Sequence, residues 1–186
     1  IESVDEGYAI VSNLCKKVVA GGFSTGAGLA LDLGTRVNGL TALFAVSPPL
    51  RLQDFSVRFL PAVGFWNRSM DLFNIDSGKM EFVENRPENP HINYFRNPVS
   101  GVRELGLLMA SVEKNLFRIK VPTLVIQGDN DPIVNPKGSR KVFERIGTAD
   151  KEYQLFNFDR HGILLGKGAE RVHEAIGDFL QRVTAK

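Results

Sequence analysis

Polar side chains of types that act together in catalysis follow three short apolar runs of the chain. They are Ser24, the aspartates Asp129 and Asp131, and His161. A serine hydroxyl is a weak nucleophile unless an imidazole takes its proton, and a carboxylate must hold that imidazole in the right tautomer. In a parallel sheet, groups that follow the strands meet at the carboxyl ends. The sequence therefore predicts nucleophilic catalysis, with Ser24 as nucleophile, His161 as general base and then acid, and one aspartate orienting His161.

The residues around Ser24 fit a sharp turn between a strand and a helix. Residues 22–26 read Gly-Phe-Ser-Thr-Gly, a G-x-S-x-G pattern whose glycines leave room for the strand and the helix to approach closely. Such a turn holds the serine in a strained backbone conformation with its hydroxyl outside the sheet. The first N–H groups of the new helix then point toward negative charge developing on a substrate oxygen.

The chain alternates between expected strands and helices in a way that is typical of a parallel sheet covered by helices. Strands are expected at residues 17–21, 40–46, 122–127 and 153–158, and helices at 4–16, 25–33, 99–117, 136–146 and 169–183. Gly34 and Gly147 are expected to end the second and the fourth of these helices. The predicted fold class is therefore α/β, with a mostly parallel sheet flanked by helices.

The middle of the chain, residues 50–98, differs from the rest. Prolines interrupt its pattern, aromatic side chains are frequent, and no convincing strand alternation is found. We expect these residues to form a helical cap inserted above the sheet. The core of the fold then consists of residues 1–49 and 99–186.

Composition argues against several classes of partner. The formal net charge of +2 is too small to favour nucleic acid, and no run approaches the roughly 18 apolar residues of an integral membrane segment. No spacing of histidines, cysteines or carboxylates favours a metal site, and the glycines form no phosphate loop, so no cofactor is expected. The single cysteine, Cys15, excludes an internal disulfide and favours a reducing compartment, from which we expect a cytoplasmic location.

Residues 18–31, 122–136 and 156–162 together resemble the α/β-hydrolase superfamily. The resemblance is strongest to its branch of monoacylglycerol lipases and serine aminopeptidase-like enzymes. It implies that the catalytic acid lies three residues after the glycine of the Gln-Gly-Asp-Asn-Asp stretch, which is Asp131. Asp129 is the weaker candidate, and its alternative role is that of a turn residue that binds its own backbone.

The activity implied by this resemblance is hydrolysis of carboxylic esters through an acyl-enzyme. The substrate would be a small-molecule ester or a lipid, such as an acylglycerol or a lysophospholipid, although peptidases, thioesterases and lactonases share the machinery. Thr25 would supply one N–H of the oxyanion hole, and Phe23, Phe59 and Trp66 would line an apolar substrate pocket. The alternative function is a non-catalytic, hydrolase-like binding or interaction module.

The resemblance also implies that the chain holds only part of the full fold. A single helix precedes the strand before Ser24, so the four expected strands correspond to strands five to eight of the full fold. The chain then resembles a C-terminal fragment that lacks the early strands and the loop that supplies the second oxyanion N–H. We expect the outer edge of residues 17–21 to need cover, from the missing N-terminal part or from a second copy of the chain.

Overall fold

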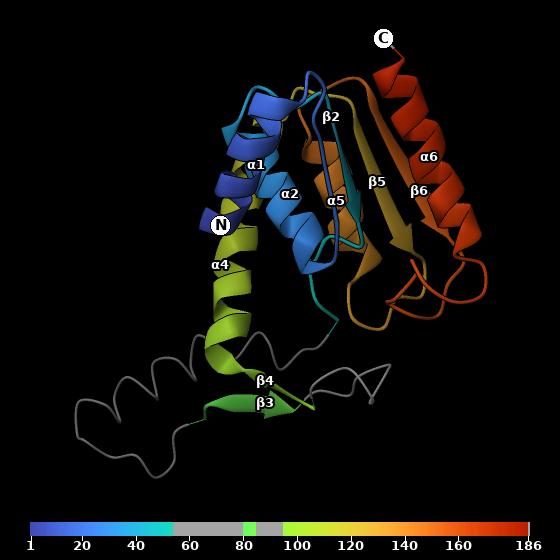
Figure 1. Ribbon diagram of the computed structural model, residues 1–186. Helices are drawn as coiled ribbons and strands as arrows, with labels where there is room; N and C mark the ends of the chain where they lie inside the picture. Colours follow the sequence, from blue (N-terminus) through green and yellow to red (C-terminus); the bar gives the residue numbers. More distant parts are fainter. Residues whose placement is uncertain (54–79, 85–94, 186) are drawn as a thin grey trace.

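A four-stranded parallel sheet forms the centre of the molecule (Figure 1). The structure, a computed structural model, describes residues 1–53, 80–84 and 95–185. In sheet order, the strands are β1 (Val19–Phe23), β2 (Ala42–Val46), β5 (Thr123–Gly128) and β6 (Lys151–Phe156). All six residues of β5 are buried, as in strands that are covered on both faces. This arrangement confirms the predicted α/β class.

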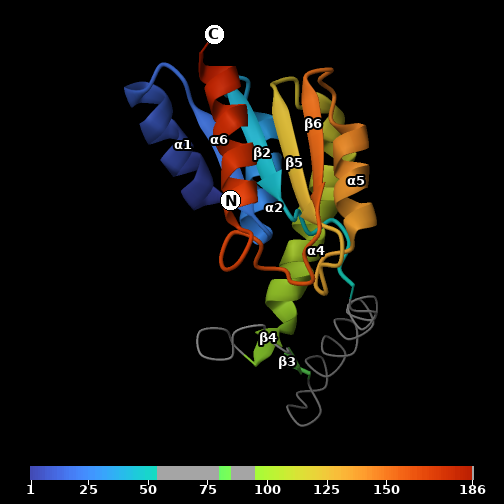
Figure 2. The ribbon, with the colours of Figure 1, turned by 90° about the vertical axis from the view of Figure 1, so that its right-hand side faces the viewer.

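Helices cover both faces of the sheet (Figure 2). One face carries α2 (Thr25–Arg36), α4 (Val99–Asn115) with the 3-10 turn η2 (Leu116–Arg118), and α5 (Pro136–Arg145), and the other carries α6 (Glu170–Thr184). Successive strand residues point to opposite faces, so Leu43 and Val125 pack with the first group of helices and Val46 and Ile126 pack with α6. The two apolar clusters fix the sheet and therefore the positions of its carboxyl ends.

The N-terminal helix α1 (Glu2–Leu14) lies at the β1 side of the molecule and buries none of its residues. An ion pair joins it to α2: the Arg36 guanidinium of α2 donates to Asp5 of α1 at 2.7 Å. Within α2, the same guanidinium donates to Asp32 at 2.8 Å. The side chains of Ile10 and Leu14 are exposed. Helix α1 is thus attached to the fold mainly through α2.

Gly34 does not end α2 as the sequence pattern suggested, because the helix continues to Arg36. A Cβ atom on Gly34 would lie 2.6 Å from Cδ1 of Leu43, so the glycine lets the helix lie close against β2. Strand β1 also begins later than expected and continues to Phe23. No loop therefore separates this strand from Ser24.

A short antiparallel pair, β3 (Phe82–Glu84) and β4 (Arg96–Pro98), corrects the expectation that residues 50–98 contain no strand. Each strand has three residues, too few for an alternating pattern to be recognised. The Arg96 guanidinium lies over the Phe82 ring, 5.5 Å from its centroid. The pair leads into α4 and lies beyond the carboxyl ends of the sheet strands (Figure 1). The division into core and cap stays a prediction.

Candidate active site

Ser24 occupies the turn between β1 and α2, in a conformation that L-residues rarely adopt. Its φ and ψ are 52° and −120°, and its N–H donates to the carbonyl oxygen of Val46 at 2.8 Å. A Cβ atom on Gly22 would lie 2.3 Å from the backbone of Gly26, so only glycine fits there. The second glycine was expected to be needed for the same reason, but a Cβ on Gly26 would meet nothing within 4 Å. The close approach therefore depends on Gly22.

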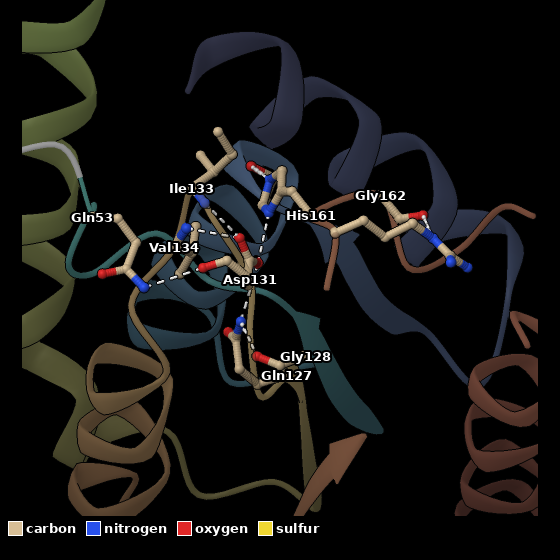
Figure 3. Close-up of polar contacts among 10 residues, drawn as sticks. Gln53, Gln127, Gly128, Asp131, Ile133, Val134, His161 and Gly162 are labelled. Atoms are coloured by element: carbon tan, nitrogen blue, oxygen red, sulfur yellow. Dashed lines mark hydrogen bonds and ion pairs between the residues drawn. The ribbon is translucent and has the colours of Figure 1, made fainter. Parts of the chain in front are cut away.

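The structure brings together Ser24, His161 and Asp131 from three strand ends. Nε2 of His161 lies 2.8 Å from Oγ of Ser24, and Nδ1 lies 2.8 Å from Oδ2 of Asp131. Figure 3 shows the His161 ring beside the Asp131 carboxylate. With the proton on Nδ1, the imidazole donates to the carboxylate and its Nε2 is ready to accept the serine proton. The His161 side chain is 14% exposed and that of Asp131 is fully buried.

The Asp131 carboxylate is held in its charged form despite this burial. Its Oδ1 accepts backbone N–H groups of Ile133 at 2.8 Å and Val134 at 2.9 Å. Burial is the largest single influence and raises the pKa of Asp131, but the hydrogen bond from His161, the two backbone donors and the charge of His161 together outweigh it. The pKa of Asp131 therefore lies below its ordinary value, so the residue is a carboxylate at neutral pH.

Two glutamines that the sequence analysis did not single out also contact Asp131 (Figure 3). Nε2 of Gln127 lies 3.1 Å from Oδ2 of the carboxylate, and Nε2 of Gln53 lies 3.1 Å from the Asp131 carbonyl oxygen. The available signal was Gln127 itself, a polar side chain in a run expected to be a buried strand. Its contact with Asp131 depends on tertiary structure.

Asp129 has a different task from the one expected for a turn residue. Its Oδ1 accepts the N–H of Phe158 at 3.0 Å, and its own N–H donates to the carbonyl oxygen of Phe156 at 2.9 Å. These two partners lie at the end of β6 and in the loop that follows, and within the turn the same Oδ1 also accepts from Nδ2 of Asn130 at 3.1 Å. Asp129 thereby ties the end of β5 to the loop that carries His161.

The remaining predicted site residues have different outcomes. Phe23 is half-buried, and its ring centroid lies 4.7 Å from that of the His161 imidazole at an interplanar angle of 37°. Thr25 is the first residue of α2, where backbone N–H groups have no acceptor within the helix. Phe59 and Trp66 lie outside the described residues. Among the described ones, Phe23 and Thr25, it is Phe23 that contacts the imidazole of His161.

Two kinds of feature are not found in the part of the chain that the structure describes. No three histidine, cysteine, aspartate or glutamate side chains there gather closely enough to hold a metal ion. Nor is any described helix long and apolar enough to cross a membrane.

A family model described as serine aminopeptidase, S33, matches residues 8–167 of the chain. The chain belongs to this family. This S33-family chain is thus a member of the α/β-hydrolase superfamily, as the resemblance of its motifs implied. Two of the relatives similar to this chain are both from Bacillus and have names that state an activity. The carboxylesterase of Bacillus subtilis (strain 168) is 22% identical over 183 residues, and the thermostable monoacylglycerol lipase of Bacillus sp. (strain H-257) is 24% identical over 152 residues.

The S33-family chain is shorter than these relatives. The two alignments cover 98% and 82% of the chain, but 71% of the carboxylesterase and 58% of the lipase. Among solved structures, the monoacylglycerol lipase of Paleococcus ferrophilus superposes with a TM-score of 0.75 at 22% identity, over 98% of this chain and 75% of that one. The structural match supports the same fold, a parallel sheet flanked by helices.

Proposed function

We propose that the protein is a serine hydrolase that cleaves carboxylic esters through an acyl-enzyme. The observation that carries this proposal is the unbroken set of contacts from Ser24 through His161 to Asp131, with both distances at 2.8 Å. A nucleophile, a base and an orienting acid in hydrogen-bond reach are the groups that acyl transfer requires. The names of the two Bacillus relatives agree with this chemistry.

In the proposed reaction, Oγ of Ser24 attacks the ester carbonyl carbon and transfers its proton to Nε2 of His161. The Asp131 carboxylate stabilises the resulting imidazolium. The oxyanion of the tetrahedral intermediate accepts a hydrogen bond from the Thr25 N–H at the N-terminus of α2. The dipole of this helix favours negative charge there. The intermediate collapses as Nε2 protonates the leaving alcohol. A water molecule, deprotonated by His161, then hydrolyses the acyl-enzyme and releases the acid.

The proposed substrate is an ester with an apolar acyl or alkyl group, such as an acylglycerol. Two aromatic side chains of the β3 and β4 region, Phe82 and Phe95, expose 48% and 61% of their surface beyond the carboxyl ends of the strands. Exposed aromatic groups on this side of the sheet favour contact with apolar ligands. Phe23 at the imidazole, with Phe59 and Trp66 from the expected cap, would complete the apolar lining. A cytoplasmic location remains part of this proposal.

The proposed nucleophile can be tested with a fluorophosphonate probe, which reacts only with activated serines. We expect the folded protein to gain the mass of one adduct on the peptide that contains Ser24, because His161 activates that hydroxyl. Ser24→Ala and heat-denatured protein should gain none, and His161→Ala should react far more slowly. Folded protein that stays unlabelled would contradict the proposal and favour the non-catalytic interaction module.

We also propose that a further strand covers the outer edge of β1 in the working enzyme. The carbonyl of Val18 and the N–H of Ser24 both bond toward β2, so the alternate residues Val19 and Gly21 direct their backbone groups outward. A groove of about 390 Å³ lies along this edge, lined by apolar residues of α1, β1 and α2 such as Val11, Ala20 and Leu29. None of the three candidate catalytic residues, Ser24, His161 and Asp131, lines this groove.

An uncovered edge of this kind promotes association. We expect chain 1–186 to form a dimer or to carry a bound peptide in solution, as read by native mass spectrometry and light scattering. Leu29→Asp, which places a charge in the groove, should abolish that association. The matched control is Leu107→Asp, at an exposed position of α4, which should leave it unchanged. A stable monomer without any bound peptide would contradict the proposed cover.

A further inference from the structure

An amide side chain lies within the fully buried strand β5. Gln127 has no exposed surface. Its Nε2 lies 3.1 Å from Oδ2 of Asp131 and 3.2 Å from the carbonyl oxygen of Gly128. Its Oε1 is buried and has no hydrogen-bond partner among the described residues.

The unpaired oxygen shows that packing does not explain this glutamine. Burying an amide oxygen without a partner is unfavourable. A methionine would fill a similar volume without that cost. The favourable part of the Gln127 environment is therefore the contact of its amide nitrogen. The orientation of the amide is fixed as well, because a flipped amide would place its oxygen against two acceptors, on Asp131 and Gly128.

The two oxygens of the Asp131 carboxylate are held differently. Oδ1 is held by the backbone of the same loop, at Ile133 and Val134. Oδ2 faces two side-chain donors, Nδ1 of His161 and Nε2 of Gln127. Without Gln127, the only side chain among the described residues that holds Oδ2 is the imidazole that Asp131 itself must orient. The two backbone donors hold Oδ1 alone, so Gln127 is the side chain that holds Oδ2 independently of the histidine.

We propose that Gln127 is a positioning residue, which fixes the rotation of the Asp131 carboxylate so that Oδ2 stays in line with Nδ1 of His161. The inference rests on the proposed function, because it assigns Gln127 a part in the same reaction. Gln127 does not touch the substrate. It acts through Asp131, and therefore on the turnover rate more than on substrate binding.

The first test compares Gln127→Met with Thr123→Val, a matched control that removes a buried polar group from the other end of β5. Loss of a hydrogen bond to a charged group should lower kcat of Gln127→Met by about 10- to 100-fold, with KM nearly unchanged. Thr123→Val should keep the wild-type kcat. In nuclear magnetic resonance, the Nδ1 proton of His161 should shift or broaden in Gln127→Met alone. Wild-type kcat together with an unchanged Nδ1 resonance would overturn the inference.

The second test is Gln127→Glu, which keeps the shape of the side chain and so guards against a misfolded methionine variant. The new carboxyl can donate to Asp131 only while it holds a proton. Its kcat/KM should therefore fall as pH rises, where the wild type keeps its activity, and a wild-type pH profile would overturn the inference. The Nδ1 resonance tests Gln127 even in a protein without esterase activity, whereas normal turnover by Ser24→Ala would refute only the proposed function.

Discussion

Replacing Ser24 with alanine should lower kcat for ester hydrolysis by about 10⁵- to 10⁶-fold, the loss seen when a triad nucleophile is removed. The hydroxyl at 2.8 Å from Nε2 of His161 is the proposed attacking group, and no acyl-enzyme can form without it. Alanine keeps the Cβ atom and so keeps the backbone conformation of the turn. The melting temperature should therefore change little. Steady-state hydrolysis of a p-nitrophenyl ester and calorimetry measure the two quantities.

Ser47 provides a matched control for this variant. It also has a positive φ, of 49°, follows the neighbouring strand β2 and is fully buried. Its Oγ has no hydrogen-bond partner among the described residues. Ser47→Ala should therefore retain turnover close to that of the wild type. Normal turnover by Ser24→Ala would refute the proposed mechanism, whatever Ser47→Ala does.

Replacing Asp131 with asparagine should lower kcat by about 10⁴-fold, as expected when a triad histidine is held in the wrong tautomer. The amide of the new side chain can donate to Nδ1 of His161, which moves the imidazole proton to Nε2. That nitrogen can then no longer accept the proton of Ser24. Because the side chain keeps its shape, substrate binding should change much less than kcat, and steady-state kinetics separate the two.

The control for the acid is Asp129→Asn. The amide oxygen of the new side chain can still accept the N–H of Phe158, now bound by Oδ1 at 3.0 Å. Turnover should therefore stay within about tenfold of the wild type, since a neutral hydrogen bond keeps about half the strength of a charge-assisted one. A large loss in Asp129→Asn with a small loss in Asp131→Asn would reverse the assignment of the acid.

The Asp131→Asn variant should also change how the stability of the fold depends on pH. Because the pKa of Asp131 is lower in the folded protein than its ordinary value, the carboxylate stabilises the folded state at pH values above that ordinary value. This contribution is lost as pH falls through the lowered pKa of the folded state. The difference in unfolding free energy between wild type and Asp131→Asn should be largest near neutral pH and shrink in acid, as urea unfolding at several pH values would measure.

The parts of the fold that depend on local sequence pattern could be predicted from the sequence. The apolar runs of β2 and β5 predicted buried parallel strands. The runs at residues 17–21 and 153–158 predicted the strands that precede Ser24 and His161. Gly34 was misread because a glycine near the end of a helix is usually a terminator, whereas here it faces Leu43 across the helix–sheet contact. Which elements pack against each other is not encoded in local pattern.

The candidate site divides in the same way. Residue types and order pointed to Ser24, His161 and one of two aspartates, and the resemblance to the α/β-hydrolase superfamily selected Asp131. The task of Asp129 at the loop after β6 and the contact of Gln127 with the Asp131 carboxylate could not be predicted, because both depend on the direction of a side chain in the folded molecule. The strands β3 and β4, with three residues each, were too short to produce a pattern.

At position 24, the residue that the proposed catalysis requires is not the residue that would make the fold most stable, because the φ of Ser24 is positive. Among the described residues, Ser24 and Ser47 are the non-glycine positions with positive φ, a conformation that costs on the order of 1–3 kcal/mol. Whole domains are stable by only about 5–15 kcal/mol. Glycine at position 24 would relieve the strain and remove the nucleophile. Laboratory evolution that selects for heat resistance alone would therefore favour glycine at position 24 and give an inactive protein. At position 47, a more stable residue could be selected without loss of the proposed activity.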